Sequence, residues 1–152
     1  MTPGVIRATV VAERVAWVRK MVDGIRNLSF STYDEFISDP RNGAAAESYL
    51  RRALEALLDL GRHILAKGFA LAPTEYKEIA QLLVEKGILS SEEGRILREL
   101  AGYRNRMVHF YHEITQQELY GICITKLSDL ESTCEAILCW LREHPNRIDS
   151  MI

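Results

Sequence analysis

Apolar residues recur at helical spacing along most of the chain. In residues 5–28 and again in residues 42–67 they fall three or four positions apart, so that they share one face of a long amphipathic helix. These positions are Val11, Val15, Val18, Val22 and Ile25 in the first segment, and Leu50, Leu54, Leu57, Leu58, Ile64 and Leu65 in the second. Because no sustained alternation of apolar and polar residues occurs, the pattern predicts helices and no strands.

Three capping sequences mark further helix starts. In each, a Ser or Thr is followed three residues later by Glu, and both side chains then bind backbone N–H groups at a helix N-terminus. Thr32 opens a short helix that Asp39-Pro40 closes, and Ser90 opens a helix whose far end is polar. Thr115 opens a last long helix, which continues through Leu141 and stops at the following proline.

Glycine and proline mark the remaining boundaries. We expect Gly68 to end the helix that begins near residue 42, because glycine readily takes the left-handed conformation of a helix C-terminus. A shorter helix is predicted over residues 73–87. The whole chain, residues 1–152, is thus predicted to form one all-α domain, a bundle of three long and two or three short helices.

Composition sets bounds on the function without identifying it. Of the 152 residues, 47% are hydrophobic and 26% are charged, which is typical of a globular domain with a core. The formal net charge of −2 carries no overall signature of a nucleic-acid-binding protein, and we expect no DNA partner. RNA contacts would have to use local arginine groups, which can equally form a solvated helix face with ion-pair partners. These groups are Arg51-Arg52 and Arg95, Arg98, Arg104 and Arg106.

The N-terminal segment and the cysteines indicate the compartment. Charged residues from Arg7 onward interrupt every apolar run, so we expect no signal peptide and no membrane span. Cys123, Cys134 and Cys139 fall in the last predicted helix without a CxxC spacing. We therefore expect free, buried thiols and no disulfide framework or zinc site. These observations predict a cytoplasmic protein with no metal and no cofactor.

Two further groups of residues have both a functional and a structural interpretation. One is a set of four side chains on a shared face of the third predicted helix, as in a helix-bundle metal site. Its members are Glu55, Asp59, Arg62 and His63. Because no other predicted helix carries a matching Glu-x-x-His motif, we favour an ion-paired stripe. The other group is Trp17 and Trp140, which we expect to be packing residues and not a platform for stacking bases.

The polar end of the helix that Ser90 opens holds the residues with the most chemistry. Residues 104–111 read Arg-Asn-Arg-Met-Val-His-Phe-Tyr. The planar fork of Arg104 suits a phosphate because it donates two parallel charge-assisted hydrogen bonds. His109 can both take and give a proton near neutral pH. Together the two side chains provide a minimal set for cleaving a phosphodiester without a metal.

Helix geometry limits how these two side chains can meet. At about 100° per residue, Arg104 and His109 lie roughly 140° apart on a regular helix. Both can reach one phosphate only if the helix ends or loosens between them, or if the substrate sits across both stripes. In the structural alternative, Arg104 pairs with a glutamate such as Glu99 or Glu118, and His109 only complements the helix dipole.

The order of residues in this segment resembles that of HEPN-domain ribonucleases, and in particular toxins of the HepT type. Arg104, Asn105 and His109 form the R-x-x-x-x-H pattern with Asn after the Arg, and Tyr111 extends it to H-x-Y. The resemblance includes the long first helix, the segment 33–39 and the helix that carries Glu55, so that it covers most of the chain. It implies a HEPN-like helical fold.

The resemblance also implies a reaction. Proteins of this kind resemble metal-independent endoribonucleases, in which the ribose 2′-hydroxyl attacks the adjacent phosphorus and leaves a cyclic phosphate and a free 5′-hydroxyl. Arg104 would stabilise charge on the transition state and His109 would act as general base or acid. Asn105 would orient the substrate or fix the imidazole tautomer. One histidine cannot easily serve as base and acid in the same turnover, so we expect a homodimer with two motifs across one cleft.

A partner is implied as well. In the HepT type, the tyrosine at the position of Tyr111 is AMPylated by a minimal nucleotidyltransferase antitoxin. The added nucleotide would bring negative charge and bulk beside Arg104 and His109, and so would block RNA, whether tRNA or mRNA. The alternative function is a non-catalytic helical module that presents Arg104 and Tyr111 to a nucleotide or a nucleotidyltransferase. A third possibility is a purely structural interaction domain.

Overall fold

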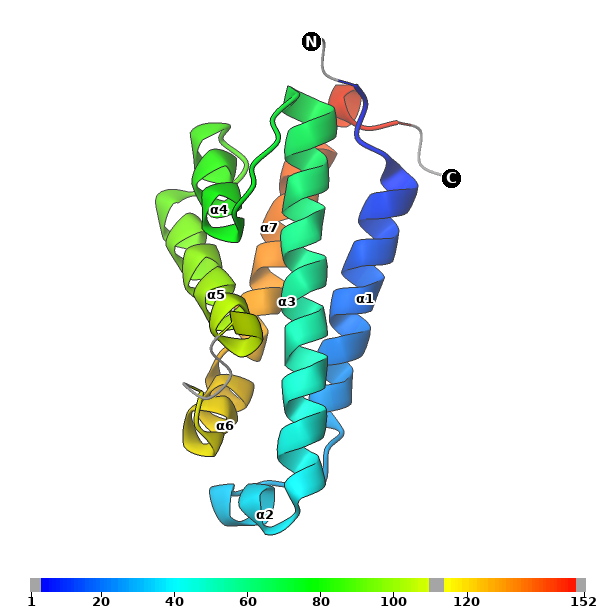
Figure 1. Ribbon diagram of the computed structural model, residues 1–152. Coiled ribbons are helices and arrows are strands. Elements are labelled where there is room, and N and C mark those ends of the chain that lie inside the picture. Colours follow the sequence, from blue (N-terminus) through cyan, green and yellow to red (C-terminus); the bar gives the residue numbers. More distant parts are fainter. Residues whose placement is uncertain (1–3, 110–113, 150–152) are drawn as a thin grey trace.

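Two long antiparallel helices, α1 (Ala8–Arg26) and α3 (Pro40–Phe69), lie side by side along the molecule (Figure 1). The computed structural model describes residues 4–109 and 114–149. The other helices in these residues are α2 (Tyr33–Ser38), α4 (Tyr76–Glu85), α5 (Ser91–His109), α6 (Gln116–Thr125), α7 (Leu127–Glu143) and the 3₁₀ helix η2 (Pro145–Arg147). Within the described ranges, extended pairing is limited to one bridge between Ile6 and Ile148. The predicted all-α bundle is confirmed.

The bundle is organised around α3. Helices α4 and α5 pack along one side of α3, α1 covers another, and α7 lies behind (Figure 1). Helices α2 and α6 contact the N-terminal half of α3 at the opposite end of the bundle from the chain termini. Every apolar position predicted for the two long helices is buried, and Leu97 and Leu100 of α5 join the same core. The helical periodicity therefore identified the inward faces correctly.

Helix α4 packs closely against the C-terminal half of α3. A Cβ atom at Gly61 of α3 would lie 2.8 Å from the Cγ2 atom of Ile79, which is closer than side chains pack. Glycine at this position therefore lets the two helices approach each other. After α4 ends, Gly87 adopts a φ of 75°, the left-handed conformation that turns the chain back toward α5.

The N-terminal caps on either side of the 104–109 segment form as predicted, with one difference. Ser90 and Glu93 exchange two hydrogen bonds, from Glu93 N–H to Ser90 Oγ at 3.1 Å and from Ser90 N–H to Glu93 Oε1 at 2.8 Å. Thr115 Oγ1 likewise accepts from the N–H of Glu118 at 3.1 Å. The Glu118 carboxylate, however, binds both terminal nitrogens of Arg106 at 2.7 and 2.8 Å. This pair ties the end of α5 to the start of α6.

The last long helix predicted from Thr115 to Leu141 is divided in two. Lys126 separates α6 from α7 and serves as the C-cap of one and the N-cap of the other. The hydroxyl of Thr125 donates to the carbonyl of Gly121 at 2.7 Å, a side-chain bond that often bends helices. Lys126 also reaches Glu99 of α5 at 2.8 Å, a tertiary contact that sequence periodicity cannot reveal. Helix α5 is as long as α1, so the described residues hold four long helices, α1, α3, α5 and α7, where three were predicted.

The predicted stop at Gly68 is wrong, because α3 continues to Phe69. Ala70 takes the left-handed C-cap conformation with a φ of 56°, and its N–H donates to the carbonyl of Ala66. Gly68 instead faces Ile6, whose Cδ1 atom would lie 3.0 Å from a Cβ at this position. At the other end, α3 begins at Pro40 with Asp39 as its cap, two residues earlier than the predicted start.

The predicted burial is wrong for Trp17 and for Cys139. Trp17 is 41% exposed, whereas Trp140 is buried and stacks on His144 at a centroid distance of 4.3 Å. Trp17 is adjacent in sequence to the fully buried Val18, so it lies about 100° away from the inward stripe of α1. Cys139 is exposed, whereas Cys123 and Cys134 are buried free thiols whose burial raises the pKa of each to about 12.

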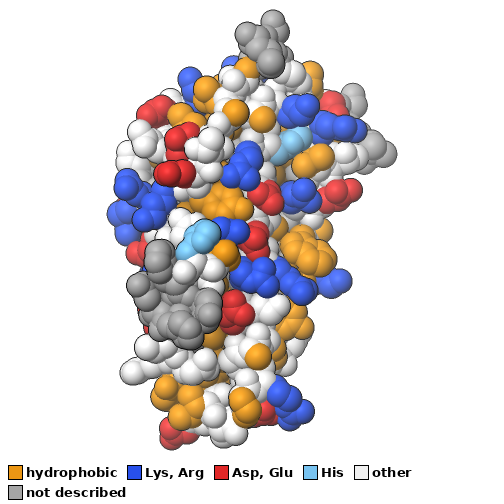
Figure 2. All heavy atoms as spheres, in the orientation of Figure 1, with side chains coloured by type: hydrophobic (Ala, Val, Ile, Leu, Met, Phe, Trp, Pro, Cys, Tyr) orange, Lys and Arg blue, Asp and Glu red, His pale blue; other side chains and the backbone are white. Residues whose placement is uncertain are grey.

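Acidic and basic side chains are interspersed over the face shown in Figure 2. Arg95 pairs with Glu92 at 2.6 Å, and Arg51 lies 3.0 Å from Glu55 on the next turn of α3. The expected ion-paired helix surface is therefore present at these arginines. Among the helices that the structure describes, none combines the length and the apolar character needed to span a membrane.

Candidate active site

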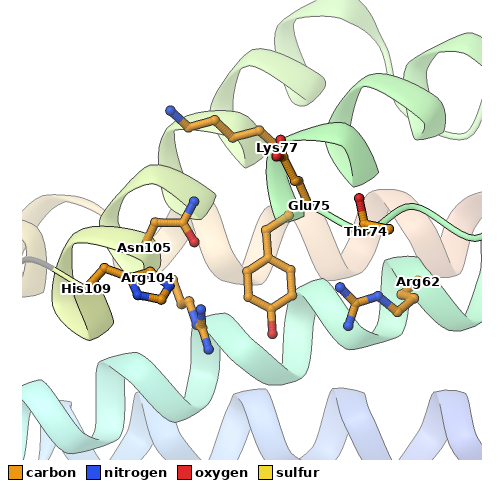
Figure 3. Close-up of a pocket in the computed structure, with 8 residues that line it drawn as sticks. Arg62, Thr74, Glu75, Lys77, Arg104, Asn105 and His109 are labelled. Atoms are coloured by element: carbon orange, nitrogen blue, oxygen red, sulfur yellow. The ribbon is translucent and has the colours of Figure 1, made fainter.

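A hollow of about 600 Å³ lies where the C-terminal end of α5 faces α3 and the start of α4 (Figure 3). Helix α5 contributes the three residues of the predicted catalytic motif, α3 contributes one arginine, and the chain around the start of α4 contributes the rest. The lining residues are Arg62, Thr74, Glu75, Tyr76, Lys77, Arg104, Asn105 and His109. The fold thus brings Arg104, Asn105 and His109 to one pocket.

Arg104 is the most enclosed of these charged residues. Its side chain is 17% exposed, and its Nη2 donates to Glu55 Oε2 of α3 at 3.2 Å. Its Nε is buried and has no hydrogen-bond partner among the described residues. Nε is thus shielded from solvent, and only the part of the guanidinium that lines the pocket is open to an anionic ligand. Glu55 holds the group in place without using its whole hydrogen-bonding edge.

Tyr76 at the start of α4 lies against two guanidinium groups. The Cζ atom of Arg104 lies 4.7 Å from the centroid of the Tyr76 ring, and the Cζ atom of Arg62 lies 5.0 Å from it. Figure 3 shows Arg62 directed toward the middle of the pocket and Arg104 directed from α5 toward α3. A ring face attracts a cation, so the Tyr76 ring helps to hold both guanidinium groups at the pocket. The sequence carried no local signal for this role, because the contacts join residues from three helices.

Asn105 and His109 form the outer edge of the pocket. They are four residues apart and so lie on one stripe of α5. Helix α5 is continuous to His109 and does not loosen after Arg104. Arg104 and His109 therefore do not converge through a break in the helix. The pocket instead extends across both stripes of α5, so that one substrate could contact both side chains. Tyr111, the expected modification site, lies outside the described residues, as do Phe110, His112 and Glu113.

Three of the four residues on this face of α3 form ion pairs, as we favoured, and His63 forms none with the residues that the structure describes. Glu55 binds Arg104, and Arg62 lies 3.4 Å from Asp59. His63 Nε2 accepts a hydrogen bond from the backbone N–H of Arg7, and burial lowers the pKa of this imidazole. Within residues 4–109 and 114–149, no three His, Cys, Asp or Glu side chains are grouped so as to hold a metal ion.

An all-α bundle with an Arg-Asn-x-x-x-His motif in a pocket is the combination that we associated from the sequence with HEPN-type ribonucleases, and comparison with protein families gives the same class. The model of the Ribonuclease HepT-like family matches residues 18–137. The chain therefore belongs to this family, and the resemblance inferred from the motif is confirmed.

Individual relatives are distant in sequence but similar in fold. A protein of Aphanizomenon flos-aquae (strain 2012/KM1/D3) described as tRNA nuclease HepT is 23% identical over 118 residues, which are 76% of this chain and 78% of the relative. A tri-AMPylated Shewanella oneidensis HEPN toxin, solved in complex with its MNT antitoxin, superposes with a TM-score of 0.77 at 20% identity. The match covers 86% of this chain and 97% of that one.

The same fold occurs in a protein without an assigned role. YutE of Bacillus subtilis, described as a cytosolic protein of unknown function, superposes with a TM-score of 0.74 at 19% identity. The match covers 93% of this chain and 94% of YutE. Since a fold does not by itself define a function, catalysis has to be inferred from the side chains of the pocket.

Proposed function

We propose that this protein is the toxin of a toxin–antitoxin pair and a metal-independent endoribonuclease that cuts tRNA or mRNA at the pocket on α5. The observation that carries the proposal is the convergence of Arg104, Asn105 and His109 on one hollow, with the Arg104 guanidinium already oriented by Glu55 and Tyr76. The family, a relative described as a tRNA nuclease and a structural relative bound to an antitoxin support the same conclusion.

The reaction assigns each side chain a task. The 2′-hydroxyl loses its proton to a general base and attacks the adjacent phosphorus, and the bond to the 5′ oxygen breaks as that oxygen gains a proton from a general acid. The products are a 2′,3′-cyclic phosphate and a 5′-hydroxyl. Arg104 binds the non-bridging oxygens, on which charge builds up in the transition state. His109 serves as base or acid, and Asn105 orients the substrate or the imidazole.

A homodimer would complete this chemistry. A single imidazole that has taken a proton from the 2′-hydroxyl is not positioned to protonate the leaving oxygen on the far side of the phosphorus. A second copy of the motif across the cleft would supply the missing group, and a symmetric dimer is the commonest assembly of soluble proteins. The position of His109 at the end of α5, on the outer edge of the pocket, is compatible with such pairing.

The direct test is RNA cleavage by the purified, unmodified protein in EDTA, with total tRNA and mRNA as substrates and His109→Ala as the inactive control. We expect cleavage by the parent, with cyclic-phosphate and 5′-hydroxyl ends on the products. If a demonstrably unmodified dimer binds RNA or nucleotide but does not cut RNA, the protein is the non-catalytic binding module instead.

The ring of Tyr76 provides a more selective test of the pocket. Replacement by Leu removes the cation–π contact with Arg104, which is worth roughly 0.5–2 kcal/mol, and we expect RNA cleavage to fall about 2- to 30-fold. Tyr76→Phe keeps the ring and is the matched control, with cleavage expected near that of the parent. Equal loss in both variants would show that the hydroxyl, and not the ring face, is what matters.

Silencing is expected to act at Tyr111. We propose that a minimal nucleotidyltransferase antitoxin transfers AMP from ATP to the Tyr111 hydroxyl with release of pyrophosphate. The Tyr111→Phe variant has no hydroxyl to accept the nucleotide, so it should remain toxic when the antitoxin is co-expressed. Mass spectrometry of the peptide around residue 111 checks the assignment, which fails if the Phe variant is still modified and silenced.

A further inference from the structure

A second hollow of about 330 Å³ lies between α1 and α3, next to the pocket that holds the motif. Its aromatic surface is Trp17, the large side chain that the structure leaves 41% exposed. Arg14 of α1 and Arg52 of α3 flank the indole, and Lys20 Nζ lies 5.5 Å from the centroid of its ring. An exposed tryptophan among cations is the arrangement with which proteins bind single-stranded nucleic acid.

The two hollows are neighbours across a row of ion pairs on α3. Glu55 lines the second hollow and binds Arg104 of the first at 3.2 Å. Asp59 also lines the second hollow, and it lies 3.4 Å from Arg62, which lines the first. In Figure 2, basic side chains continue across the middle of this face, over α3 and toward α1. A chain held at Arg104 can therefore extend over this row into the second hollow.

The charges of the second hollow favour an anionic ligand. Its two carboxylates contact cations outside it, since Glu55 contacts Arg51 and Arg104 and Asp59 contacts Arg62. Burial raises the pKa of Asp59, and within the hollow the charge of Arg14 also acts on this carboxyl group and opposes that rise. Arg14 and Arg52 form no ion pair within 4.0 Å with any residue that the structure describes. Two arginines beside an accessible indole are thus left to bind phosphate.

We propose that this hollow is a second nucleotide subsite, at which Trp17 stacks on a base of single-stranded RNA while Arg14 and Arg52 bind the adjoining phosphates. The subsite rests on the proposed function, because the strand it holds is the one cut at the neighbouring pocket. It would select substrates that are unpaired for at least one nucleotide beside the cut, since a base in a duplex cannot stack on an external indole.

A second copy of the chain would fit the second hollow less well than RNA would. A symmetric interface centred on Trp17 would bring the same surface of both copies together. Arg14 and Arg52 of one copy would then be buried near those of the other, where like charges without partners are costly. The charge of the hollow therefore favours RNA over self-association.

Binding can be measured without cleavage by using a fluorescently labelled 2′-O-methyl oligoribonucleotide, which lacks the attacking hydroxyl. We expect Trp17→Ala to weaken binding in fluorescence anisotropy about 5- to 20-fold, and Trp17→Phe, which keeps a stacking ring, to weaken it less. Arg52→Ala should lower the slope of log binding constant against log salt by about 0.7, as the loss of one phosphate contact does for a single strand.

The outcomes separate the subsite from the proposed function. Unchanged oligonucleotide affinity in Trp17→Ala and Arg52→Ala overturns the subsite, even if the parent cleaves RNA. Loss of affinity in these variants supports the subsite, even if the parent fails to cleave RNA and the proposed reaction is wrong. A Trp17→Ala variant that shifts from dimer to monomer in analytical ultracentrifugation would make the hollow a protein interface and overturn the proposal.

Discussion

Replacement of His109 by Ala is expected to reduce RNA cleavage about 10²- to 10⁴-fold, which is the usual contribution of a positioned general acid or base. His109 is the last residue of α5 and lines the pocket beside Arg104 and Asn105. An exposed side chain at a helix terminus adds little to the core, so the melting temperature should change little. Single-turnover cleavage at saturating protein measures the effect on the chemical step.

The matched control for this variant is His144→Gln. His144 lies after α7, where its ring stacks on Trp140, and it does not line the pocket. Its replacement should leave cleavage within about twofold of the parent, because His144 lies away from the pocket and takes no part in the proposed reaction. Equal rates for His109→Ala and the parent would remove the imidazole from the mechanism and leave Arg104 as a binding group.

Replacement of Arg104 by Lys is expected to reduce cleavage about 10²- to 10³-fold, the cost of removing one preorganised donor at a transition state. Lysine keeps the positive charge opposite Glu55, so the ion pair of α5 with α3 has a replacement partner. It loses the planar fork that we propose to bind phosphate, and with it the stacking on Tyr76. The Arg104→Lys variant therefore tests whether cleavage needs the planar guanidinium or only a positive charge at this position.

Arg98→Lys serves as the control on the same helix. Arg98 is exposed and lies outside the lining of the pocket. We expect it to cleave RNA at the rate of the parent, with urea unfolding of both lysine variants within about 1 kcal/mol of the parent. If Arg104→Lys cleaves as fast as Arg98→Lys, a point charge is sufficient at this position and the fork has no role in the transition state.

The motif in residues 104–109 could be predicted because its residues are adjacent in sequence. The pocket around it could not, since Arg62 and Tyr76 come from α3 and from the start of α4. The sequence predicted a helix from residue 73, but the chain before Tyr76 is not helical, and Thr74 and Glu75 line the pocket. Their position follows from the close approach of α4 to α3 at Gly61, which no local pattern records.

Trp17 shows a limit of reasoning from apolar stripes. The inward face of α1 was predicted correctly from Val15, Val18 and Val22, yet an adjacent tryptophan was assigned to the same packing surface. Whether a large apolar side chain next to the stripe is covered depends on which helices pack nearby. Here α3 leaves the indole 41% exposed, and this exposure is what suggests a second subsite.

Sequence alone determined the helical class, the inward faces of α1 and α3, and the motif residues that we propose as the catalytic group. These features depend on periodicity, capping and neighbouring residues, and all three are local. Only the tertiary structure decided the partner of Arg104. In the structural alternative, Glu99 or Glu118 would pair with Arg104, but they bind Lys126 and Arg106, and Glu55 of α3 lies beside Arg104. That choice depends on how closely separate helices approach each other, a distance that is set by the packing of the whole core.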